Sequence, residues 1–293
     1  MWPSLADLKA SVPLLWPPEL QKLLPPRSKA YLEEQQGRLD RDWEASASAL
    51  PEGSYLMFRY FWLIVNTRCF FWPHNRWPPR NRKYKRGRPP AKLSSDDQMA
   101  LCPIADYFNH SDTLTASFES DVNGCWISVE QDLNAGEEIF FRYATQNNDY
   151  LLVEYGFVLS TNRDDNVNID DAILPWLDEN QKALLQEYNY FGKYTLSEEG
   201  VCHRTQCAIR TILHSDNEDN VKSFLSGDDD GTAQQPHVDA WILDMLRDCL
   251  KRTSSITANL ENMDESPQGN LLLKRYLQMT TLFVELMQSG QYS

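Results

Sequence analysis

Two short stretches constrain this chain more than any other part of its sequence. Residues 102–111 form an apolar run that ends in Asn109-His110. Residues 135–143 combine a glycine-containing turn, two carboxylates and a β-type run that ends in Tyr143. Taken alone, the Asn-His string fits a turn or a helix cap, and the tyrosine fits a strand end packed on a core. The order in which the two stretches follow each other is therefore the informative feature.

The bulk composition is typical of a globular chain. Its 293 residues suffice for one large domain or two ordinary ones, and no stretch approaches the roughly 20 apolar residues of a membrane span. The proline-punctuated start lacks the basic and apolar regions of a signal peptide. Six cysteines without paired spacing favour a reducing compartment, so we expect a cytoplasmic or nuclear protein without membrane contact.

One group of candidate metal ligands occurs, at Cys202-His203 and Cys207. These residues resemble half of a zinc site, but no second ligand pair follows them. We therefore predict a helix face with two buried thiols and no metal.

The net charge of −14 is unevenly distributed. Residues 76–92 contain eight Lys/Arg and no Asp/Glu, so the rest of the chain is strongly acidic. An acidic surface attracts basic partners, and a ribosomal protein or a histone would be such a partner. Ordinary solubility is the alternative explanation of the same charge.

Hydrophobic periodicity predicts an α+β first half and an all-helical second half. A helix is expected at 28–50 with Ser28 as its cap, and a buried helix is expected at 52–71. The basic, proline-rich segment 73–98 is predicted to be a mobile insertion, and the acidic segment 226–235 a disordered loop. Further helices are predicted at 147–155, 175–190, 204–214, 238–262 and 269–289, and strands near 114–118, 125–130 and 138–142, the first two joined by an Asn123-Gly124 turn.

The order of the motifs resembles the SET-domain methyltransferases, in the branch of the Rubisco large-subunit lysine methyltransferase and its fungal relatives that modify ribosomal proteins. The resemblance covers about residues 50–160 by motif. It implies that residues 1–160 form a partial SET domain, with a helical insertion over about 1–72 and the basic loop at 73–98, and that residues 161–293 form a helical, substrate-binding-like domain. The motifs that carry it are Val65–Phe70 with Arg68, Pro103–Asp106, Asn109-His110, Tyr143, Asn148 with Leu151-Leu152, and Tyr155-Gly156-Phe157.

The resemblance also implies the chemistry, which is methyl transfer from S-adenosylmethionine to a lysine of a ribosomal or other basic protein. Tyr143 would be catalytic, because a tyrosine hydroxyl can hold the lysine amine or contact the methyl group through weak C–H···O bonds. Asn109 and His110 would hold the adenine through backbone groups. Cofactor contacts are implied for Arg68, Asp106, Asn109, His110, Tyr143, Gly156 and Phe157, and substrate contacts for Arg68, Asp106 and Tyr155.

The sequence departs from the family at its start. The family's first cofactor element is a Gly-x-Gly loop, whereas the first glycines here are the isolated Gly37 and Gly53. A shortened gene model or fragment, a short relative that has lost catalysis, or an unrecognised substitute segment would each explain this. We expect weak or absent S-adenosylmethionine binding by the chain as given. The alternative function is a catalytically inactive, SET-derived protein-binding module, and specificity for histidine instead of lysine also stays open.

The basic insertion is a second departure. Its segment Tyr84–Pro90, with Arg86 and Arg88, resembles an AT-hook, whose arginines enter the narrow minor groove of A·T-rich DNA. A nuclear-import signal and a solvated loop are the alternatives, so DNA is kept only as a possible partner. We expect a monomer.

Overall fold

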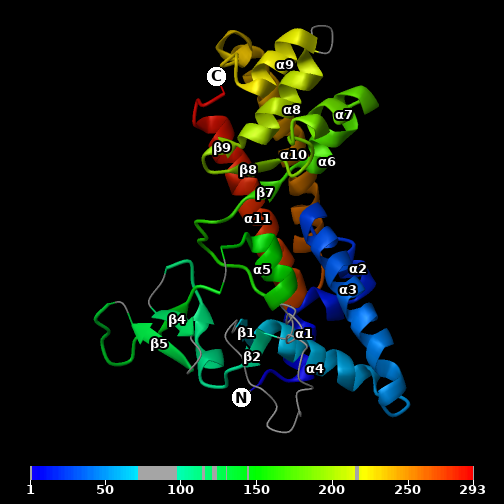
Figure 1. Cartoon of the computed structure of the whole chain (residues 1–293), viewed down its shortest axis with the longest axis vertical. Helices are drawn as coiled ribbons and strands as arrows, with labels where there is room; N and C mark the ends of the chain where they lie inside the picture. The colour runs from blue at the N-terminus through cyan, green and yellow to red at the C-terminus, as the bar shows by residue number, and fades with distance from the viewer. Residues whose placement is uncertain are drawn as a thin grey trace, which may run out of the picture. The chain divides into compact units, whose positions relative to one another are not determined.

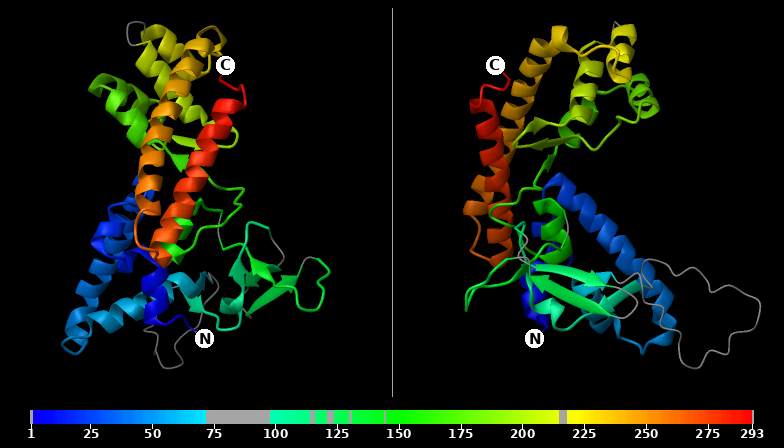
Figure 2. Two further views of the ribbon diagram at one scale, coloured as in Figure 1. Left: turned by 180° about the vertical axis from the view of Figure 1, so that it is seen from behind. Right: turned by 60° about the vertical axis from the view of Figure 1, so that its left-hand side comes forward.

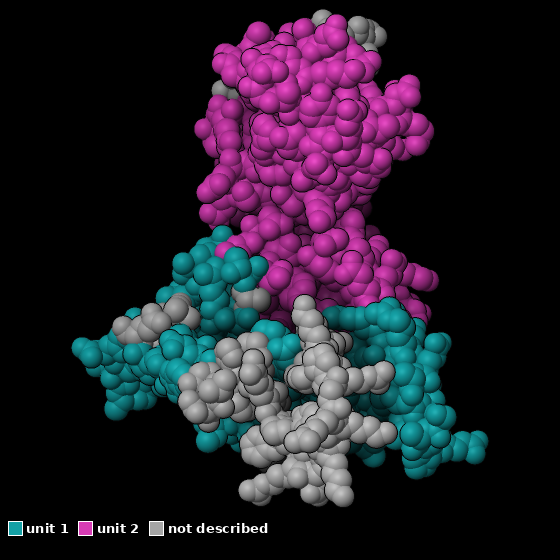
Figure 3. Space-filling view, viewed as in Figure 1, with its two compact units in different colours: residues 1–2, 37–145, 159–163 teal, residues 3–36, 146–158, 164–293 magenta. Residues whose placement is uncertain are grey.

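The computed structural model forms two compact units, coloured separately in Figure 3. The first unit comprises residues 1–2, 37–145 and 159–163, and the second comprises residues 3–36, 146–158 and 164–293. The structure describes residues 2–71, 98–113, 116–120, 124–129, 131–143, 145–214 and 218–292. The basic loop predicted at 73–98, including Arg86 and Arg88, therefore lies outside the described residues except for Gln98.

The first unit contains a four-stranded mixed sheet with strand order β3-β6-β4-β5. β4 and β5 pair antiparallel, as predicted for the two strands, and Asn123 of the predicted turn lies outside the described residues; β3 and β4 both run parallel to β6. Its small core consists of Ala105, Ala116 and Phe141 with aromatic neighbours. The elements of the unit, drawn in Figure 1, are η2 (Ala47–Ala49), α4 (Tyr55–Arg68), β1 (Cys69–Phe71), β2 (Met99–Leu101), η4 (Ala105–Tyr107), β3 (Asn109–His110), β4 (Ala116–Ser120), β5 (Cys125–Val129) and β6 (Phe140–Phe141).

The second unit is mainly helical, and its two longest helices, α10 and α11, pack side by side, as Figure 2 shows. Helix α3 (Pro26–Ser46) begins in this unit and continues into the first. The remaining elements are α1 (Leu5–Ser11), η1 (Pro13–Leu15), α2 (Pro18–Gln21), α5 (Asn148–Tyr155), β7 (Val167–Asn168), α6 (Asp170–Ile173), η5 (Leu174–Trp176), α7 (Glu179–Glu187), β8 (Thr195–Ser197), β9 (Gly200–Val201), α8 (His203–Leu213), α9 (Glu218–Ser226), η6 (Thr232–Gln234), α10 (Gln235–Glu261) and α11 (Pro267–Gln288).

The boundaries of the two units differ from the single boundary predicted at residue 160. Residues 3–36 belong to the second unit because Trp16, Leu20 and Leu24 are buried in its hydrophobic core. The second half is also not all-helical, since β7, β8 and β9 form a small antiparallel sheet. These strands are two or three residues long, which is too short to give an alternating hydrophobic pattern in the sequence.

Three local predictions also need correction. Helix α4 is only partly buried, because Trp62 to Ile64 are covered while Leu56 is 63% exposed. Ser28 does not cap α3, which begins at Pro26; its hydroxyl instead donates a hydrogen bond to Asp149. The acidic segment at 226–235 contains the 3-10 helix η6, and Arg210 donates a hydrogen bond to the carbonyl of Gly231 at its start. Among the described residues, no helix has the length and apolarity to cross a membrane.

Candidate active site

Strands β3 and β6 bring Asn109-His110 beside the end of the second sequence stretch. Asn109 is paired with Phe140, and His110 with Phe141. The Asn109 side-chain amide donates a hydrogen bond of 2.6 Å to Glu138. His110 is buried, with 8% of its surface exposed. The predicted adenine-binding pair is thus held by a parallel strand pairing and by one carboxylate of the Gly-Glu-Glu turn.

Tyr143 is fixed at both its backbone and its hydroxyl. Its N–H donates to His110 Nδ1 at 2.9 Å, and its hydroxyl donates to the Phe108 carbonyl at 2.6 Å. The rings of Tyr143 and His110 lie 5.1 Å apart. Because Nδ1 accepts this hydrogen bond, the neutral imidazole carries its proton on Nε2. Because the hydroxyl proton is donated to a carbonyl, the tyrosine oxygen is left to act as a hydrogen-bond acceptor toward a ligand.

Arg68 and Asp106 form an ion pair near this tyrosine. Arg68 Nη1 lies 2.8 Å from Asp106 Oδ1, and both side chains are largely covered. Burial raises the pKa of Tyr143 to about 12; the Arg68 charge lowers it and the Asp106 charge raises it. Arg68 Nε is buried without a hydrogen-bond partner among the described residues. An unpaired buried donor is costly, so this N–H fits an acceptor such as the carboxylate of the implied cofactor.

The remaining predicted residues lie in the second unit, at the end of α5. Asn147 caps this helix by accepting a hydrogen bond from the Tyr150 N–H, and Gly156 ends it in the left-handed conformation, with φ of 80°. The ring centroids of Tyr155 and Phe157 are 6.1 Å apart. Tyr155, Gly156 and Phe157 therefore form one local arrangement, whereas Arg68, Asp106, Asn109, His110 and Tyr143 form another in the first unit.

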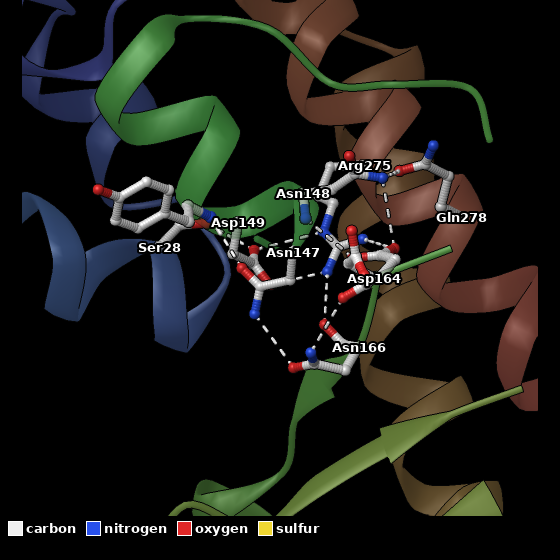
Figure 4. A network of polar contacts seen from close by, with 10 residues as sticks. Ser28, Asn147, Asn148, Asp149, Asp164, Asn166, Arg275 and Gln278 are labelled. Carbon is white, nitrogen blue, oxygen red and sulfur yellow. Dashed lines mark hydrogen bonds and ion pairs between the residues drawn. The ribbon is translucent and has the colours of Figure 1, made fainter. Parts of the chain in front are cut away.

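A buried ionic network holds the other end of α5 (Figure 4). Arg275 of α11 is fully buried and pairs with Asp149 at 2.7 Å and with Asp165 at 2.6 Å. Burial lowers the pKa of Arg275, but the two carboxylates outweigh this effect and raise it. Ser28 donates to Asp149, and Asn148 donates to Gln278. The network ties α3, α5, α11 and the segment before β7 together within the second unit.

Sequence reasoning missed two parts of this arrangement. The sequence marks Glu138 only as one of two carboxylates, because the parallel register that places it beside Asn109 has no local sequence signal. Arg275 was not singled out, although it is three residues after Leu272 and four before Met279, which are both buried. A charged residue at this spacing lies on the buried face of its helix and needs a partner there.

Cys202, His203 and Cys207, which resemble half of a zinc site in the sequence, lie at the start of α8. Cys207 is buried and its sulfur lies 3.5 Å from His203 Nε2. No group of three or more potential ligands occurs among the described residues. His203 is exposed and its ring lies 5.7 Å from that of Phe224, whereas Cys202 is only half-buried, so one of the two thiols predicted to be buried is partly accessible.

Replacing Gly156 with alanine should destabilise the protein. The alanine would need a left-handed backbone, and its Cβ would lie 2.9 Å from backbone and side-chain atoms of Ser11. We expect the free energy of unfolding to fall by about 2–4 kcal/mol, measured by urea denaturation. Gly192→Ala is the matched control, because its φ is also positive but nothing lies within 4 Å. Equal losses in the two variants would contradict the close approach to Ser11.

The raised pKa of Tyr143 gives a prediction at high pH. A group whose pKa is raised on folding from 10.0 to about 12 favours the folded state below pH 10, and this contribution is lost as the pH rises through 12. We expect the unfolding free energy of the wild type to fall more steeply between pH 10 and 12 than that of Tyr143→Phe. Parallel curves for the two proteins would show that Tyr143 titrates normally.

Comparison with solved structures identifies the fold. A crystal structure of the SET domain of LSMT bound to lysine and AdoHcy matches 95% of this chain and 67% of its own chain, with a TM-score of 0.55 and 13% identity. A structure of Rubisco LSMT bound to sinefungin and monomethyllysine matches 96% of this chain and 67% of its own, with a TM-score of 0.53 and 13% identity. The chain therefore has the SET-domain fold together with the helical region that follows it.

Sequence comparison indicates which methyltransferases the chain is similar to. Residues 165–289 match the model of the ribosomal lysine N-methyltransferase 2 C-terminal domain. Ribosomal lysine N-methyltransferase set11 of Schizosaccharomyces pombe is 30% identical over 66% of this chain and 49% of its own length. Ribosomal lysine N-methyltransferase 2 of Saccharomyces cerevisiae is 23% identical over 98% of this chain and 66% of its own length. Human actin-histidine N-methyltransferase is 25% identical over 55% of this chain and 30% of its own length.

These matches confirm the resemblance found in the motifs. The chain is similar to SET-domain protein-lysine methyltransferases, to the ribosomal lysine enzymes by sequence and to Rubisco LSMT by fold. It spans about half the length of the first of these curated relatives and about two thirds of the second.

Proposed function

We propose that the protein transfers a methyl group from S-adenosylmethionine to a lysine side chain of a protein substrate. The observation that carries the proposal is Tyr143, whose hydroxyl is held at 2.6 Å from the Phe108 carbonyl beside the Arg68–Asp106 ion pair. A fixed, uncharged hydroxyl suits methyl transfer to an amine, because this reaction needs alignment of two reactants and no covalent enzyme intermediate. The names of the relatives support lysine as the acceptor.

The predicted site residues would have separate roles in cofactor binding and in substrate binding. S-adenosylmethionine, when bound, supplies an electrophilic methyl group on a sulfonium. Arg68 Nε and the backbone of Asn109-His110 would hold the cofactor. Tyr143 would orient the neutral lysine amine through its oxygen, and its hydroxyl is protonated at physiological pH, which lies well below its pKa. Tyr155 would line the lysine channel, with Gly156 and Phe157 beside it.

The substrate we favour is a ribosomal or other basic protein. Residues 164–293 contain 22 Asp/Glu and 10 Lys/Arg, so the helical half presents negative charge to a partner. The match to the C-terminal domain of a ribosomal lysine methyltransferase supports the same substrate class. The six free cysteines support a reducing compartment, the cytoplasm or the nucleus. We propose a monomer, which sedimentation of the purified chain would test.

Two measurements on the purified chain test the proposal. Calorimetric titration with S-adenosylhomocysteine measures the cofactor site, and tritium transfer from methyl-labelled S-adenosylmethionine to purified ribosomal proteins measures the reaction. Micromolar binding with label in a lysine would support the enzyme and would overturn the weak binding expected from the missing Gly-x-Gly. Protein binding without cofactor binding would favour the inactive module, and label in a histidine would overturn the lysine assignment.

A further inference from the structure

A wide groove in the second unit lies outside the candidate active-site residues. It runs along one face of α10, between that helix and the α6–η5 segment, and has a volume of about 1210 Å³. On α10 its lining residues recur at intervals of three, four and seven positions, as expected for one helix face. The lining consists of Asp171, Ala172, Pro175, Trp176, Trp241, Asp244, Met245, Asp248, Lys251, Arg252, Ser255 and Ile256.

Two indole rings form one end of this groove. Trp176 of η5 is 63% exposed, although tryptophan usually buries most of its surface. Its ring lies 6.4 Å from that of Trp241 on α10, at an interplanar angle of 80°. The two rings thus present an edge-to-face corner to solvent. Aromatic faces of this kind attract ammonium and guanidinium groups, and tryptophan attracts them most strongly.

Carboxylates line the groove beside the indoles. Asp244 and Asp248 follow Trp241 on the same helix face, and Asp171 lies on the opposite wall. Two cations also line the groove, but Arg252 pairs with Asp171 at 3.4 Å and also donates a hydrogen bond to the Cys249 sulfur. Asp244 pairs with the exposed Arg247, and such exposed pairs exchange readily for another cation. The lining residues include three carboxylates against the two cations Lys251 and Arg252, an excess of one negative charge, and Asp248 forms no ion pair with any of the described residues.

We propose that this groove binds a Lys/Arg-rich segment of a protein partner, with one cationic side chain seated on Trp176 and Trp241 and neighbouring cations facing Asp244 and Asp248. The acidic surface of residues 164–293 would draw such a segment toward the groove. The proposal rests on the proposed function in one respect, since it takes this partner to be the protein substrate. The groove would then bind a segment of the substrate other than the one that contains the target lysine.

The test is binding of a short, fluorescein-labelled, lysine- and arginine-rich peptide to the full chain, measured by fluorescence anisotropy. We expect Trp176→Ala to weaken binding about fivefold or more, the range of a cation–π contact, and Trp176→Phe to retain part of the affinity. Asp248→Asn should weaken binding about threefold. Its peptide affinity should depend on salt concentration no more steeply than that of the wild type. Asp264→Asn, a matched loss of one exposed carboxylate between α10 and α11, should leave the dissociation constant within about twofold of wild type.

The proposal is overturned if Trp176→Ala and Asp248→Asn bind the peptide as Asp264→Asn does. It is also overturned if the wild type is a dimer in sedimentation equilibrium and Trp176→Ala dissociates it, because a second copy would then occupy the groove. The readout is peptide binding and not methyl transfer. If the groove does not bind the peptide, the cofactor titration and the tritium assay still test the proposed function. If those two assays are negative, the peptide measurement still tests the groove.

Discussion

Arg275→Ala is expected to lower the free energy of unfolding by about 3–5 kcal/mol, the cost of breaking a buried ion pair by removing one partner. The side chain of Arg275 is 0% exposed, and that of its partner Asp149 is 2% exposed. The substitution would leave Asp149 buried without its cation and would open a cavity between α5 and α11. Urea denaturation followed by far-UV circular dichroism gives the measurement.

Arg247→Ala is the matched control for this loss. Arg247 and Asp244 form an ion pair of 2.6 Å on the same helix, but their side chains are 64% and 76% exposed. An exposed pair of this kind contributes about 0–1 kcal/mol, so the control should remain near wild type. If Arg275→Ala and Arg247→Ala lost similar amounts, the buried network of Figure 4 would not be a main support of the second unit.

The network also connects stability to the candidate site. Asp149 is in the first turn of α5, and Tyr155 and Gly156 are at the other end of this eight-residue helix. Because the helix is short, contacts that hold its first turn also hold the position of its last turn. They therefore help to set the position of the aromatic residues Tyr155 and Phe157. This makes Arg275 a positioning residue for the second group of predicted site residues, since it contacts them only through α5.

Local signals explain which elements could be predicted. The pattern at 147–155 became α5, with Asn147 as its cap, because capping and helical periodicity depend on residues a few positions apart. The hairpin of β4 and β5 has the same origin in a turn signal between two short apolar runs. The helices α7, α8, α10 and α11 followed from apolar periodicity in the same way.

Long-range pairing explains what could not be predicted. The parallel register of β3 and β6 joins residues about thirty positions apart, and nothing in either strand specifies it. Arg275 meets Asp149 across 126 positions, and the sequence offers many carboxylates as alternatives. The first unit does bring Arg68, Asp106 and Tyr143 together, as the family resemblance implied, whereas their catalytic and binding roles stay predictions.

Tyr143→Phe is expected to lower the rate of methyl transfer about a hundredfold, the scale of losing one positioned polar group in the transition state. The substitution removes the oxygen that would orient the amine but keeps the ring beside His110, so affinity for S-adenosylhomocysteine should stay within about threefold of wild type. The lost hydrogen bond to the Phe108 carbonyl should cost only about 1 kcal/mol of stability.

Single-turnover tritium transfer separates this catalytic effect from a structural one. Tyr188→Phe removes a hydroxyl at the end of α7 and should leave the rate within about twofold of wild type, because no proposed step uses it. A Tyr143→Phe protein that binds S-adenosylhomocysteine normally and still transfers methyl groups at the wild-type rate would remove Tyr143 from the mechanism. The shared loss of cofactor binding and of rate would instead make Tyr143 a binding residue, since its hydroxyl would then act in the ground state as well as in the transition state.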